Sequence, residues 1–142
     1  MRRILKYICA VAMAVTTCSC GPKDQEQKAL GPEETVQAFY KAVSRGDFEA
    51  AAELCDTVSM GSYLEMNRNN WEHMRQTDST VAEIAASLLS SAEVEIGDVV
   101  RENDRRMVHY SIDAVMGMKK NKIATVKKEG SAWKVEKITD AH

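Results

Sequence analysis

The stretch PEETVQAFYKAVSRGDFEAAAELC, residues 32–55, contains two short amphipathic patterns separated by a Gly-Asp break. Pro32 suits the first turn of a helix, because the N–H group that proline lacks has no partner there. Gly46 is typical of a helix end, and Asp47 can cap a second helix. The stretch therefore predicts a helical hairpin. The apolar residues at helical spacing in its first half are Val36, Phe39, Tyr40 and Val43.

Residues 57–91 follow the predicted hairpin and fall into two parts. Between 57 and 75, apolar residues are spread among polar ones, and the pattern predicts no definite element. After Asp78 or Ser79 as a cap, the sequence predicts a helix that ends near Ser91. The residues expected on its buried face are Val81, Ile84, Ala85, Leu88 and Leu89.

From Ala92 onward, apolar residues recur with period two, which is typical of strands. The clearest strand runs from Val108 to Met116, and Gly97 is expected to mark a bulge in the strand before it. Residues 103–104 and 129–131 have the composition of tight turns. Helices followed by an antiparallel four-stranded meander indicate the α+β class. We expect one core between the two layers, formed by Phe39, Tyr40, Leu54, Leu88, Tyr110, Ile112 and Trp133.

Residues 1–19 are typical of an export signal, with a basic start and a short apolar run. A transmembrane helix needs roughly 20 apolar residues, so the run predicts a cleaved signal rather than an anchor. The cysteines that follow resemble the lipobox of bacterial lipoproteins, which implies a signal peptide removed before a lipid-modified (palmitate-bearing) cysteine. Cys20, preceded by the small residue Ser19, is the expected lipidation site, and Cys18 is the alternative.

We expect a flexible tether at residues 20–31, since they are polar and lack apolar periodicity, and a single domain at residues 32–142. Without the signal the chain is more acidic than the net charge of −2 for the whole sequence. This balance argues against a nucleic-acid partner. The expected location is the bacterial cell envelope, with the protein lipid-anchored in the membrane on the periplasmic side or the outer-membrane surface.

Residues 32–55 and the late meander ending in AWKVEKI (132–138) resemble the small lipoprotein branch of the nuclear transport factor 2-like superfamily. The resemblance implies a cystatin-like or lumazine-binding-like fold, in which a curved sheet wraps the helices into a cone. Members of that superfamily include isomerases, cyclases and binding modules, so the resemblance leaves the function open.

The sequence offers no catalytic set of residues. The apolar face of the strand from Val108 carries no acid, and His109 and Asp113 alternate onto the other face. The three histidines are scattered, so we expect no metal site and no cofactor. Cys55 lies in a helical apolar pattern and is expected to be buried rather than reactive.

These observations favour a binding domain of unknown function over an enzyme. We expect it to bind a small apolar ligand or a protein partner, which includes a second copy in a homodimer. The alternative is a small-molecule enzyme of the isomerase or cyclase type. The candidate pocket residues are Tyr40, Tyr63, Trp71, Met107 and Tyr110.

Overall fold

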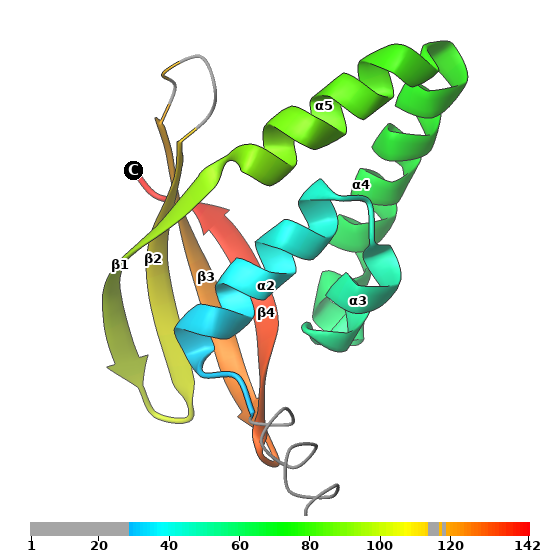
Figure 1. The fold of residues 1–142 in the computed structure, drawn as a ribbon. Helices are drawn as coiled ribbons and strands as arrows, with labels where there is room; N and C mark the ends of the chain where they lie inside the picture. Colours follow the sequence, from blue (N-terminus) through cyan, green and yellow to red (C-terminus); the bar gives the residue numbers. More distant parts are fainter. Residues whose placement is uncertain (1–28, 114–116, 118) are drawn as a thin grey trace, which may run out of the picture.

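In a computed structural model, which describes residues 29–113, 117 and 119–142, helices cover one face of a four-stranded antiparallel sheet (Figure 1). The α+β class and the four-stranded sheet are therefore confirmed. The helices are α2 (Pro32–Ser44), α3 (Phe48–Glu53), α4 (Thr57–Thr77) and α5 (Ser79–Ser91). The strands are β1 (Glu93–Glu102), β2 (Arg105–Asp113), β3 (Lys119–Glu129) and β4 (Ala132–Asp140).

Aspartates start three of the helices. Asp47 accepts a hydrogen bond from the Ala50 N–H group at 3.1 Å and so caps α3. Asp78 caps α5 in the same way, as the sequence predicts. Between α2 and α3, Gly46 has a φ of +74°, which a residue with a side chain rarely adopts. The helical hairpin and the third predicted helix are thus confirmed.

Residues 57–75, for which the sequence predicts no definite element, lie in a single long helix. Helix α4 has 21 residues and begins at a cap formed by Asp56, which accepts from the Val58 N–H group at 3.0 Å. Its buried residues are Met60, Leu64 and Trp71. Because they are spaced at four and seven residues, they form one narrow stripe along the helix.

The strands pair in sequence order, β1-β2-β3-β4, as a simple meander. The register between β1 and β2 shifts between Ile96 and Val99, which confirms the expected bulge at Gly97. The expected turns are also present, with positive φ angles at Asn103 and Gly130. The last residues of the strand predicted to reach Met116 lie outside the described residues.

One core fills the space between the helices and the sheet. Phe39, Tyr110 and Ile112 are buried in it, as expected. Tyr40, Leu54 and Trp133 are partly buried and pack against it.

The expected burial of Leu88 is wrong, since 44% of this residue is exposed. Helix α5 packs mainly on α4 and α2 rather than on the sheet. Ala82 is its one buried residue. The apolar face predicted for α5 therefore exists, but much of it is exposed to solvent.

This arrangement also corrects the expected cone. Figure 1 shows α4 and α5 as a hairpin that extends past the end of the sheet, while α2 crosses the sheet face. A cone would require the sheet to curve around all of the helices. Here α2 and α4 make the main contacts between the helical layer and the strands.

The junction of α3 and α4 is joined to the edge strand β4. The Asp56 N–H group donates to the Val135 carbonyl at 2.8 Å, and the Val135 N–H group donates to the Leu54 carbonyl at 2.9 Å. Cys55, which lies between Leu54 and Asp56, pairs with Val135 as an isolated β-bridge and is only 4% exposed. Burial raises the pKa of its thiol, with a smaller effect of Asp56, so Cys55 is a packing residue.

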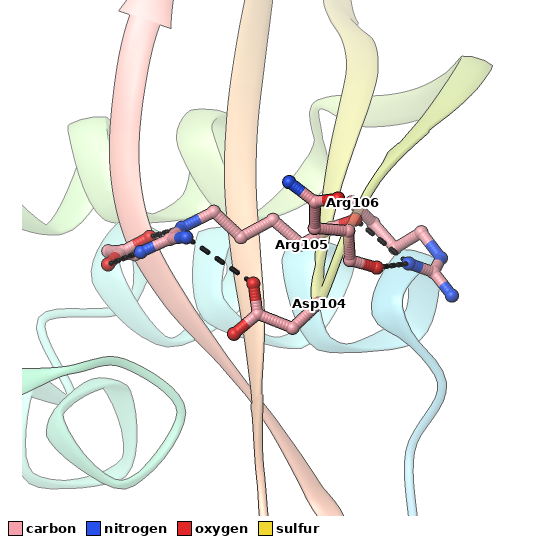
Figure 2. Close-up of polar contacts among 5 residues, drawn as sticks. Asp104, Arg105 and Arg106 are labelled. Carbon is pink, nitrogen blue, oxygen red and sulfur yellow. Dashed lines mark hydrogen bonds and ion pairs between the residues drawn. The ribbon is translucent and has the colours of Figure 1, made fainter.

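On the sheet, Arg105 joins two strands that are not neighbours. Figure 2 shows its side chain crossing β3 towards β4. Its guanidinium group donates to the two carboxylate oxygens of Glu136 at 2.7 and 3.2 Å, and a third contact at 3.3 Å reaches Asp104. The hydrogen bond from Arg105 lowers the pKa of Glu136. This pair connects β2 with β4 across β3.

We predict different costs for removing two apolar side chains of the helical layer. Phe39→Ala should lower the free energy of unfolding by about 3–5 kcal/mol, because it leaves a cavity in the core. Leu88→Ala should change it by less than about 1 kcal/mol, since the residue is largely exposed. Urea unfolding of both variants measures the difference. Equal costs would mean that the α5 face is packed in solution.

Candidate functional site

A cavity of about 150 Å³ lies where α2, α4 and α5 meet the sheet. Helix α2 contributes Tyr40 to its lining, α4 contributes Tyr63 and Trp71, and β2 contributes Tyr110. The remaining lining residues are Phe39, Val43, Ser44, Asn67, Leu89 and Ile138. None of these described residues carries a charge, so the cavity is apolar with a few neutral polar groups.

The walls of the cavity are fixed by contacts among the lining residues themselves. The indole N–H group of Trp71 donates to the Val43 carbonyl at 3.2 Å, near the end of α2. The rings of Phe39 and Tyr63 lie 6.1 Å apart between centroids, which is within the range of favourable aromatic pairs. These contacts connect α2 with α4 and hold the cavity open in a defined shape.

Three tyrosine hydroxyl groups converge on this site. Burial raises the pKa of Tyr110, and the neighbouring Tyr63 and Tyr40 raise it further. Burial also raises the pKa of Tyr40, with a smaller effect of Tyr63. The pKa of Tyr63 is raised by burial as well, although Lys122 and Asn67 counteract this effect. All three groups therefore stay protonated at neutral pH and can both donate and accept hydrogen bonds.

The structure brings together four of the five pocket residues that the sequence predicts. Tyr40, Tyr63, Trp71 and Tyr110 line the same cavity. Met107 does not line it, because side chains alternate along β2 and Met107 lies on the face opposite to Tyr110. Its inclusion among the pocket residues is therefore wrong.

Sequence reasoning did not assign six of the ten lining residues to the site, and two of these six are informative. Asn67 follows Tyr63 by four positions on α4, so the two share a helix face, and its side-chain amide donates to the Tyr63 carbonyl at 2.7 Å. Leu89 belongs to the α5 face that was expected to be buried in the core, and it borders the cavity instead. A helix-face analysis of residues 57–75 would have found Asn67.

No acid–base pair faces the cavity within the described part of the chain. Asp113 is exposed, and His109 is half-buried on the face of β2 opposite to Tyr110. Over the same residues, no cluster of histidine, cysteine or carboxylate side chains could hold a metal ion. None of the described helices is long and apolar enough to cross a bilayer. The expected lipidation sites, Cys18 and Cys20, lie outside the described residues.

Larger hollows on the surface are more open and polar. One of about 580 Å³ lies between α2 and β1 and is lined in part by Glu93, Glu95 and Asp113. Another, of about 380 Å³, lies beside the loop between α2 and α3. Ligand sites are mostly apolar with a few polar groups, so the smaller aromatic cavity is the better candidate for a specific site.

Comparisons with known proteins identify no family. No protein-family model matches the chain, and no protein of curated function matches it. A similar solved structure is that of RPA3114, a SEC-C motif containing protein from Rhodopseudomonas palustris. The two chains are 14% identical, with a TM-score of 0.47, and the match covers 87% of this chain and 89% of the other.

The expected membership of the nuclear transport factor 2-like lipoprotein family is therefore wrong. No protein-family model matches the chain, so no comparison supports that membership. The expected cone is also absent, because α5 packs on other helices rather than inside the sheet. The residues that suggested the resemblance form a helical hairpin and a meander, which occur in many unrelated α+β proteins.

Proposed function

We propose that the protein is a lipid-anchored binding protein of the bacterial cell envelope, and that its domain binds a small apolar ligand in the aromatic cavity. One observation carries this proposal: Tyr40, Tyr63, Trp71 and Tyr110 come from three separate elements and line one small apolar space. Ligand sites are commonly concave, mostly apolar and supplied with a few polar groups. The cavity has each of these properties.

The alternative is an enzyme of the isomerase or cyclase type. Such chemistry needs a group that can accept and donate a proton within hydrogen-bond reach of the substrate. The described lining of the cavity has no carboxylate or imidazole, and its tyrosines have raised pKa values. A phenol that stays protonated is a weak general base at neutral pH, so binding is the better supported function.

The proposed anchor rests on the sequence alone. The basic start, the short apolar run and Ser19-Cys20 together favour signal cleavage before Cys20 and acylation of its thiol. Two or more acyl chains give stable attachment, at about 0.8 kcal/mol for each buried CH₂ group.

The exposed face of α5 favours a second candidate function, which is self-association. Val81, Ile84 and Leu88 are each more than 40% exposed and lie at helical spacing on one face. Glu83 is the single charged residue of α5. Two copies of the face could therefore meet with little charge repulsion, which makes a second copy of the chain the fitting partner.

For ligand binding, we predict that an apolar compound that enters the cavity raises the melting temperature of the purified chain. A ligand present at 100 times its dissociation constant should stabilise the protein by about 2.7 kcal/mol. Leu89→Trp should remove the effect by filling the cavity from α5. Ser87→Trp, on the opposite side of the same helix, is the matched control. No stabilisation by any compound in a screen that spans one-ring molecules to steroids would end this proposal.

For the anchor, we predict that the mature chain begins at Cys20 and carries added acyl mass. Intact mass spectrometry of the membrane-extracted protein measures both. Cys20→Ala should release the protein from the membrane, whereas Cys18→Ala should leave it attached. The reverse pattern would assign the lipid to Cys18, and an unmodified soluble chain would refute lipidation.

For self-association, we predict that the purified chain forms dimers at micromolar concentration and that Ile84→Lys makes it monomeric. A buried lysine in the interface would lose its hydration without a partner. Light scattering after size exclusion measures the mass. Glu83→Lys, also exposed on α5 but outside the apolar stripe, is the control. A wild-type chain that stays monomeric would exclude this candidate.

A further inference from the structure

The volume of the aromatic cavity limits the size of its ligand. Pockets for drug-sized molecules usually measure about 300–1,000 Å³. This cavity measures about 150 Å³. An engineered apolar cavity of about that volume binds benzene, so the space suits a molecule with roughly six to ten non-hydrogen atoms. A steroid or a fatty acid would not fit without rearrangement of the helices.

The hydroxyl groups indicate that the ligand has a polar atom. Tyr110 is only 5% exposed. Among the described residues, its hydroxyl has no hydrogen-bond partner, yet no buried polar atom of the described chain is left unsatisfied. Tyr110 also borders a wider surface hollow beside Asn121. Its hydroxyl interacts with Tyr63 and Tyr40, which line the aromatic cavity and not that hollow, so we place the hydroxyl at the aromatic cavity. A ligand atom there could complete its hydrogen bonding, with Tyr40 and Tyr63 close by.

The charges around the cavity favour a neutral ligand. None of the described lining residues is charged. The charged groups that affect the pKa values of Tyr63 and Tyr110 are Lys122 and Asp140, which pair with each other at 2.7 Å. Their fields largely cancel, so a charged ligand would lose its hydration without a counter-charge.

We propose that the cavity binds a neutral molecule with a single ring and one hydrogen-bonding group, and that the Tyr110 hydroxyl bonds to that group. This inference rests on the proposed ligand-binding function and names its ligand class. The ring lies among the aromatic and aliphatic walls, where burial provides most of the binding free energy. The hydroxyl groups provide the preference for one polar substituent at a defined position.

The test uses p-cresol and toluene as a matched pair, since they differ by one hydroxyl group. Isothermal titration of the purified chain should show p-cresol binding about 3- to 10-fold more tightly than toluene, which is the usual effect of one hydrogen bond. Tyr110→Phe should weaken p-cresol binding by about the same factor and leave toluene within about twofold. Equal affinities for the two compounds, or no effect of Tyr110→Phe on p-cresol, would overturn the role of the hydroxyl.

Three further probes test size and charge. Progesterone, p-toluate and choline should each bind more weakly than p-cresol. Tighter binding of p-toluate would overturn the neutral ligand in favour of an anion. Tighter binding of choline would overturn the neutral ligand in favour of a cation held in an aromatic cage. Stabilisation by progesterone without binding of p-cresol would refute the ligand class and leave the proposed function standing. Failure of every apolar probe would refute both.

Discussion

The backbone bridge between Cys55 and Val135 fixes the relation of the two layers. One hydrogen bond on each side of Cys55, at Leu54 and at Asp56, attaches the start of α4 to Val135 of the edge strand β4. Since α4 is one continuous helix of 21 residues, its attachment at one end helps to set the position of Tyr63 and Trp71 further along it. The bridge also pairs part of the backbone at the edge of the sheet, which would otherwise be open to other chains. The shape of the aromatic cavity therefore depends on a contact that does not itself touch the cavity.

Local sequence patterns predict much of the fold because the elements have strong local signals. Asp47 and Asp78 cap helices where the sequence places them, and Gly97 marks the bulge in β1. Helix α4 was missed because its buried stripe is only one residue wide, while Val58 and Met66 are apolar and exposed. For α5, the pattern predicts an amphipathic helix correctly but cannot say what covers its apolar face. That depends on packing between elements far apart in the chain.

Local sequence patterns likewise predict only some of the residues that line the site. Strand alternation places Tyr110 on the inner face and Met107 on the outer face, so the alternation itself argues against Met107. The grouping of Tyr40 with Tyr63 depends on how α2 packs against α4, which no periodicity specifies. The family resemblance failed for a related reason. A helical hairpin and a meander are locally favourable units, and the same units assemble into different folds according to contacts such as those of α5.

The position of β4 after all the other described elements has a consequence for how the domain folds. As synthesis proceeds from the amino terminus, α2 to α5 emerge long before the strand that Leu54 and Asp56 bond to. Val135, which is fully buried, belongs to β4, the last of the described elements along the chain. Until then the helices have an incomplete surface to pack on, and the core cannot close. Folding of the domain therefore waits until β4 has been synthesised, and a chain that stops before β4 cannot complete this core.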